Sequence, residues 1–139
     1  MLFRSYFGVD PVLFAAVADT GVHRSSDGGR TWAASGLPGH RVSDLAWLGP
    51  LLYAATDRGL MRSEDAGAHW AALGEGLRGP TPARLLFPLG PDSAAEIFLA
   101  TNQGVFRSAD GGVRWTTSGL RDEPVIALAT FPILRQVPE

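Results

Sequence analysis

Three arginines that recur at one position of the sequence are the first candidates for binding chemistry. Arg24, Arg62 and Arg107 each stand directly before a serine. A guanidinium group is planar, always charged and suited to carboxylate and phosphate ligands. Because the three positions are equivalent in successive repeats, we expect the arginines to lie in a row and not to converge on one ligand. We interpret each as paired within its own repeat or stacked on a tryptophan, with anion binding at Arg24, Arg62 and Arg107 as the alternative.

The other residue types that could carry catalysis form no recognisable constellation. Tyr53 aligns with Phe14 and Phe98 of the other repeats, which indicates a packing position in a strand. The chain has no cysteine and therefore no thiolate nucleophile or thiolate metal site. The glutamates and histidines are scattered without the spacing of a carboxylate pair or a metal site: Glu64, Glu75, Glu96, Glu123, His23, His40 and His69. We expect no catalytic residue, no cofactor and no metal.

Each arginine precedes an eight-residue motif, called the octad here, that occurs three times. The octads span residues 25–32, 63–70 and 108–115, and each reads Ser-x-Asp-x-Gly-x-x-Trp. Their first residues are 38 and 45 positions apart, a range in which a fixed period indicates a propeller or a solenoid. The defining residues are Ser25, Asp27, Gly29 and Trp32, then Ser63, Asp65, Gly67 and Trp70, then Ser108, Asp110, Gly112 and Trp115.

The residue types of the octad suit a tight turn. An aspartate can accept hydrogen bonds from the N–H groups that follow it, and glycine adopts positive φ without steric cost. Ala66 replaces the first of two adjacent glycines, Gly28, which indicates that the second glycine is the constrained one. The tryptophan can cover the turn and pack between neighbouring repeats. We interpret the octads as structural elements of the fold.

Short strands surround each octad. The second repeat predicts strands at 42–48, 51–56, 60–63 and 70–73, and the third predicts strands at 83–89, 96–101, 105–108 and 115–118. The first repeat predicts 12–17, 22–25 and 32–35, with 2–7 as a weaker opening strand.

Four antiparallel strands per repeat predict an all-β fold, a partial β-propeller in one domain: blades at 2–37, 40–77 and 82–120, and an extra strand at 125–131. An immunoglobulin-like sandwich is the alternative, but it does not explain the threefold turn.

Composition excludes several partners. The chain has 139 residues, of which 45% are hydrophobic and 19% charged, and a formal net charge of −2. This balance offers no excess of positive charge for nucleic acid or an anionic membrane. Residues 12–18 resemble part of a secretory signal, but they align with the predicted strand at 51–56, and no apolar run reaches the roughly 18 residues of a membrane span. We expect no nucleic acid, no membrane span and a cytoplasmic location by default.

The octads resemble the Asp-box, or BNR, repeats of sialidase-like propellers over about residues 3–131. Flanking pieces such as Gly104-Val105-Phe106-Arg107-Ser108 resemble bacterial photosystem II assembly-factor-like and sortilin-like members. The resemblance implies that the octads lie at the blade periphery, away from any catalytic centre. It also implies a closed ring of at least six blades, whereas this sequence supplies about three. The convergent arginines, tyrosine, glutamate and aspartate that sialidase-type catalysis needs are not matched here.

These observations favour a non-catalytic module that binds a protein or a small ligand. Repeat proteins usually place recognition on loops that interrupt the repeat, here 76–82 and 90–95. The alternative is a fragment or subunit of a sialidase-like hydrolase that acts on glycans and has its catalytic blades elsewhere.

Counting blades gives an expectation about assembly. Blades pack face to face, so three blades leave two apolar faces uncovered. Two copies can close a six-bladed ring as a homodimer, with strand 125–131 of one copy replacing strand 2–7 of the other. The competing interpretation is an incomplete propeller from a truncated reading frame.

Overall fold

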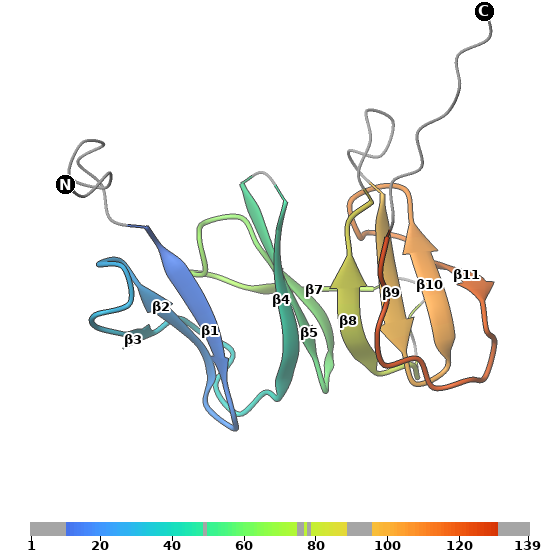
Figure 1. Cartoon of the computed structure of the whole chain (residues 1–139), viewed down its shortest axis with the longest axis horizontal. Coiled ribbons are helices and arrows are strands. Elements are labelled where there is room, and N and C mark those ends of the chain that lie inside the picture. The colour runs from blue at the N-terminus through green and yellow to red at the C-terminus, as the bar shows by residue number, and fades with distance from the viewer. Residues whose placement is uncertain (1–10, 49, 75–76, 78, 89–95, 131–139) are drawn as a thin grey trace, which may run out of the picture. The chain divides into compact units, whose positions relative to one another are not determined.

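The computed structural model describes residues 11–48, 50–74, 77, 79–88 and 96–130, and it is all-β over these residues. The chain divides into two compact units, residues 1–73 and 74–139, and each is described by itself. The two units contain three antiparallel sheets, which are the predicted propeller blades (Figure 1). Within the described residues, no helix has the length and apolar character needed to cross a membrane.

Unit 1 holds blades one and two. Blade one comprises β1 (Leu13–Val17), β2 (Gly21–Ser25) and β3 (Ala33–Ala34), in that spatial order. Blade two comprises β4 (Val42–Leu48), β5 (Leu51–Thr56), β6 (Gly59–Ser63) and β7 (Ala71–Leu73), also in chain order. The opening strand predicted at 2–7 lies outside the described residues.

Blade three forms the described sheet of unit 2. It comprises β8 (Pro82–Leu86), β9 (Ile97–Thr101), β10 (Gly104–Ser108) and β11 (Thr116–Gly119), again in chain order. The predicted strand at 83–89 is observed as β8, which starts one residue earlier and ends at Leu86.

The extra strand predicted at 125–131 is not formed over its described part, 125–130. The Val125 N–H donates to the Thr101 carbonyl at 2.8 Å. Thr101 belongs to β9, however, and β9 is already paired with β8 on one side and β10 on the other. Because a strand requires a free edge to pair with, the segment adds no further strand to blade three, and its predicted place as the opening strand of blade one in a second copy stays a prediction.

In blades two and three, the hairpin loop between the second and third strands also binds the segment that leads into the first strand of the blade. In blade two the Arg41 N–H donates to Asp57 Oδ1 at 3.0 Å, and the Asp57 N–H donates to the Arg41 carbonyl at 3.0 Å. In blade three Thr81 and Asn102 make the same pair of bonds, at 2.7 and 3.2 Å. A short acceptor side chain at this loop position therefore fixes where each linker ends.

Blades one and two share an apolar core inside unit 1. Val22 and Leu37 of blade one are buried together with Ala54 of blade two. Partly buried side chains pack around them: Phe14, Val42, Leu45, Met61 and Trp70. Side chains alternate between the two faces of a sheet, so one face of blade two lies against blade one. This joint brings the octad of blade two against the end of β3.

Candidate functional site

Each octad forms a turn that its serine closes from inside. Ser25, Ser63 and Ser108 are at most 1% exposed. Each hydroxyl donates to Oδ1 of the aspartate two positions later at 2.8–2.9 Å. It also accepts the N–H of the glycine four positions later at 2.8–2.9 Å. The buried hydroxyl is thus used as donor and as acceptor, which holds the two ends of the turn together.

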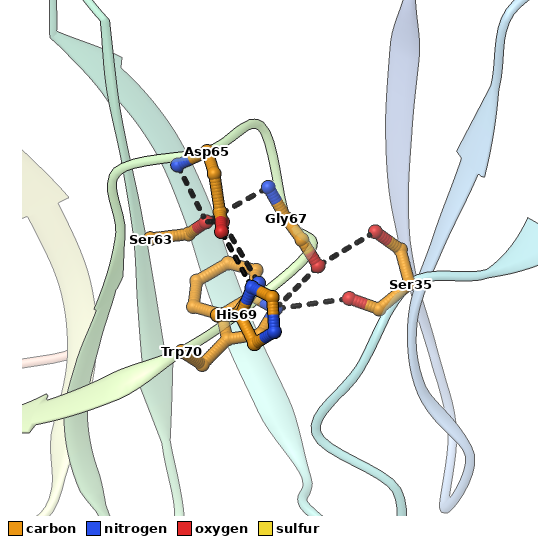
Figure 2. Close-up of polar contacts among 6 residues, drawn as sticks. All are labelled: Ser35, Ser63, Asp65, Gly67, His69 and Trp70. Atoms are coloured by element: carbon orange, nitrogen blue, oxygen red, sulfur yellow. Dashed lines mark hydrogen bonds and ion pairs between the residues drawn. The ribbon is translucent and has the colours of Figure 1, made fainter.

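The aspartate of the octad holds the second half of the turn, as Asp65 shows (Figure 2). Its Oδ1 accepts the His69 N–H at 2.8 Å, and its Oδ2 lies 2.6 Å from His69 Nδ1. Hydrogen bonds to a carboxylate favour its charged form. The His69 backbone N–H contributes most, then the His69 ring, and together they lower the pKa of Asp65 to about 2.

The other two octad aspartates have the same character. The Thr31 hydroxyl and backbone N–H lower the pKa of Asp27, and the Arg114 N–H, followed by the Ser108 hydroxyl, lowers the pKa of Asp110. The residue four positions after the aspartate differs in all three blades, yet its N–H bonds the carboxylate each time. The turn therefore depends on the backbone at this position and tolerates different side chains.

In blade two, the octad tryptophan links its own turn to blade one. Trp70 Nε1 donates to the Gly67 carbonyl at 3.1 Å and to the Ser35 carbonyl of blade one at 2.9 Å. The Ser35 hydroxyl donates back to the Gly67 carbonyl at 3.1 Å (Figure 2). In blade one, Trp32 Nε1 donates to the Gly29 carbonyl of its own turn at 3.1 Å, and Trp32 is 45% exposed.

The structure corrects the expectation that only the second octad glycine is constrained. Ala66 has φ of 57° and Gly67 has φ of 88°, so both positions are left-handed. Gly67 is the stricter position for a second reason. A Cβ there would lie 2.5 Å from Ser35 Oγ and 3.1 Å from Phe14 Cε1 of blade one. The packing between blades, added to the backbone conformation, therefore requires glycine.

The three repeat arginines have different surroundings. Arg62 forms an ion pair with Glu64 at 3.2 Å. The Nε of Arg107 donates to Glu96 Oε2 at 2.6 Å. Arg24 differs, because its Nε is buried and has no hydrogen-bond partner among the described residues. A buried donor without an acceptor costs free energy, and such an atom in a native structure calls for a ligand or a water molecule.

Arg24 lines a surface pocket between blades one and two, with a volume of about 410 Å³. The wall from blade one consists of Arg24, Ser26 and residues 33–36, and the wall from blade two is the octad segment 65–68. Asp65 is the acid in this wall, and its oxygens already accept bonds from Ser63 and His69. Arg24 is therefore the cationic side chain among the residues that line this pocket.

The pocket also reaches an exposed strand edge. β3 is the outer strand of blade one, and both of its residues, Ala33 and Ala34, are exposed. An outer strand presents backbone donors and acceptors with which an extended peptide can pair. A guanidinium at the same place can bind a carboxylate through charge-assisted hydrogen bonds. The pocket thus combines the two groups that bind an acidic extended segment.

A second pocket of about 240 Å³ lies on blade two. Its lining residues are Arg62, Glu64, Asp65, His69, Trp70 and Ala71. Arg62 contacts Glu64, and His69 contacts Asp65. Because its charged groups contact one another, this pocket offers a ligand less than the pocket at Arg24 does.

The remaining candidates from the sequence do not converge. Tyr53 is fully buried. His23 contacts the Thr20 hydroxyl at 3.1 Å, and His40 contacts the Pro38 carbonyl at 3.3 Å. In the part of the chain that the structure describes, no three His, Asp or Glu side chains are placed to hold a metal ion.

Several candidates lie outside the described residues. These are Glu75, loop 90–95 and positions 76 and 78 of loop 76–82. Glu123, which is described, donates its N–H to the Leu120 carbonyl at 3.0 Å in a turn after β11.

Two sequence positions indicate the distinct environment of Arg24, although aligning the three arginines alone does not reveal it. The strand registers align Val12 with Glu96 and Ser26 with Glu64. Both carboxylates that pair with the equivalent arginines are therefore replaced in blade one. Treating the three arginines as equivalent hid this difference, because the partners and not the arginines depart from the repeat.

Solved structures with a similar fold bear out the propeller architecture. No family model and no curated protein matches the sequence. YCF48 from Cyanidioschyzon merolae matches with a TM-score of 0.58 and 21% identity, over 74% of this chain and 31% of that chain. YCF48 bound to D1 peptide matches with a TM-score of 0.59 and 20% identity, over 73% of this chain and 35% of that chain. An ancestral GH74 enzyme matches with a TM-score of only 0.42 and 18% identity, over 82% of this chain and 24% of that chain.

The chain therefore spans about a third of the length of the YCF48 structures that it matches. At this level of identity the likeness concerns the fold. Together with the three antiparallel sheets, it shows that the chain is built of β-propeller blades.

Proposed function

We propose that this chain is a non-catalytic propeller module that binds an extended segment of another protein. The observation that carries the proposal is the environment of Arg24. Its buried Nε has no partner among the described residues, and the side chain lines the pocket of about 410 Å³. The existence of YCF48 bound to D1 peptide supports a peptide as the class of ligand, since that protein has the same fold.

The proposed ligand lies along β3 and places a carboxylate on Arg24. Backbone pairing with Ala33 and Ala34 supplies affinity that does not depend on sequence. The carboxylate supplies specificity through charge-assisted hydrogen bonds with the Arg24 guanidinium, whose side chain lines the pocket. The carboxylate can come from an acidic side chain or from the end of a peptide chain.

Peptide binding to purified variants tests this proposal. The probe is a library of short peptides with free carboxyl ends, together with an amidated copy and a copy in which Asp and Glu are replaced by Asn and Gln. We expect Arg24→Gln to weaken the best binder by at least about tenfold, because a hydrogen bond to a charged group contributes roughly 1.5–3 kcal/mol. The amidated and neutral copies separate the two sources of carboxylate.

Arg62→Gln is the matched control, because it removes the same charge from the equivalent position of blade two. Arg62 already contacts Glu64, so its loss should leave peptide binding unchanged. Equal weakening by the two variants, or no binding by any peptide, would overturn the proposed role of Arg24.

The alternative of a glycan hydrolase gains no support from the described residues. Tyr53 is fully buried, and the carboxylates of Glu64 and Glu96 contact arginines of their own blades. A panel of fluorogenic glycosides tests it directly. Cleavage that disappears when one pocket residue is replaced would favour the hydrolase.

The proposal includes an assembly of two copies. The described residues of each chain form three sheets, and we propose that two chains related by a twofold axis together supply the blades of a six-bladed ring. The exchange of strand 125–131 between copies stays a prediction, with residues 125–130 in no strand of the single chain.

A further inference from the structure

One face of blade one carries exposed apolar side chains. Leu13, Val17 and Trp32 are 40%, 40% and 45% exposed. The residues of blade two that correspond to Leu13 and Val17 are Leu52 and Thr56, which are 2% and 0% exposed. Leu13 and Leu52 hold the same register position, opposite the octad serine. The difference in exposure therefore comes from what covers each face.

Blade one covers the corresponding face of blade two with the corner that follows β3, residues 35–37. The Ser35 carbonyl accepts the Trp70 Nε1–H at 2.9 Å. The indole lies directly beside Gly36, since a Cβ on Gly36 would be 2.6 Å from Trp70 Cδ1. Leu37 is 5% exposed in the shared core. A tryptophan of one blade thus docks on the corner of the blade before it.

Blade three has a corner of the same form at residues 118–120. Ser118, Gly119 and Leu120 repeat the sequence Ser-Gly-Leu of residues 35–37. Leu120 has φ of 53° and Leu37 has φ of 55°, so the two corners share their left-handed leucine. Leu120 is nevertheless 62% exposed, and a Cβ on Gly119 would have no described atom within 4 Å. The corner has the docking conformation and an exposed surface.

The geometry points to docking of Trp32 of one copy on the 118–120 corner of a second copy, which we propose as the seam of the assembly. This inference rests on the pairing of two copies in the proposed function. Trp32 Nε1 donates to the Ser118 carbonyl, and Leu120 becomes buried as Leu37 is. In a dimer with a twofold axis this contact occurs twice, once in each direction. Trp32 and Leu120 of both copies are then covered.

Sedimentation of the purified chain, from nanomolar to tens of micromolar concentration, tests the seam. We expect a dimer whose dissociation constant rises by at least about a hundredfold in Trp32→Ala, because each of two seams loses a buried aromatic ring. Leu120→Ser should weaken the dimer in the same direction. Trp47→Ala is the control for the loss of an exposed tryptophan, since Trp47 is 52% exposed on β4 and its ring lies against Phe14 inside unit 1 and not at the seam. Its dimer should dissociate as the wild type does.

Crosslinking shows whether the two halves of the seam come from different copies. The chain has no cysteine, so Gly28→Cys and Ser118→Cys each introduce a single thiol. Their counterparts in the joint of unit 1, Ala66 and Ser35, line one pocket together. We expect a short bismaleimide to link the two variants when they are mixed and to link neither variant with itself. Gly28→Cys should fold, because Ala66 takes positive φ at the same position.

The outcomes separate the seam from the pairing of copies. A monomer at all concentrations would overturn both. A dimer that Trp32→Ala leaves intact, and that forms no mixed crosslink, would overturn the seam and leave the pairing of two copies standing. Peptide binding at Arg24 is measured independently and is decided by neither result.

Discussion

Blades one and two contain the same octad in different surroundings. In blade two the tryptophan, Trp70, donates to a carbonyl of the preceding blade, and the arginine contacts a glutamate. In blade one Trp32 is 45% exposed, and the buried Nε of Arg24 has no partner among the described residues. The octad residues thus determine the turn in both blades. Whether a repeated side chain packs or can bind something else depends on its neighbours.

The largest expected difference in stability between the two blades is at the second glycine of the octad, Gly67 or Gly29. Gly67→Val should destabilise unit 1 by about 2–5 kcal/mol, because it combines positive φ with a clash against Ser35 and Phe14. Gly29→Val should cost only about 1–3 kcal/mol, since a Cβ there meets the flexible end of Leu13 at 3.3 Å. Urea unfolding of both variants measures the difference. Equal losses would mean that the joint between blades adds nothing at this position.

The tryptophans give the next largest difference. Trp70→Ala should destabilise the protein by about 2–4 kcal/mol, because a partly buried ring and a hydrogen bond to blade one are lost. Trp32→Ala should cost about 1 kcal/mol or less at concentrations where the chain is monomeric. Chemical denaturation monitored by circular dichroism gives both values. Similar losses at low concentration would show that Trp32 is packed within the single chain.

Acid should weaken the octad turn of blade two in a defined range. The pKa of Asp65 is lowered from 3.8 to about 2, so the folded state favours the carboxylate. The stabilisation is present above about pH 4 and is lost as the pH falls toward 2. Asp65→Asn should melt at a lower temperature than the wild type at neutral pH, and the gap should shrink across this range. A gap that stays constant down to pH 2 would contradict the role of the charge.

The smallest expected effect is a stabilisation. Ala66 has φ of 57° where blade one has Gly28 at φ of 75°. Ala66→Gly removes the left-handed strain, which costs an L-residue roughly 1–2 kcal/mol. Glycine also raises the conformational entropy of the unfolded chain, which offsets part of this gain. We expect a net gain of about 0.5 kcal/mol in thermal or urea unfolding. A loss of stability would show that the methyl group of Ala66 makes a useful contact.

The fold could be predicted from the sequence because its signals are local. The run 51–56 became β5, and each octad became the turn that precedes the last strand of its sheet. The segment predicted as a strand at 125–131 forms none over its described part in the single chain, and the sheet that it was predicted to join belongs to a second copy. The candidate site depends on residues far apart in sequence. Arg24 could be recognised as one of three repeated arginines, but its lack of a carboxylate partner follows from Val12 and Ser26, and its pocket follows from the Asp65 turn on the opposite wall.

The reciprocal bonds between Arg41 and Asp57 also show where the chain can be lengthened. Leu37 is buried at the start of the linker, and Arg41 is bound through its N–H and its carbonyl at the end. Only residues 38–40 lie between these two fixed points, and a Cβ on Gly39 would have no described atom within 4 Å. An epitope or a fluorescent label grafted at Gly39 would therefore leave both anchors in place, and the blades could carry a reporter without altering the pocket.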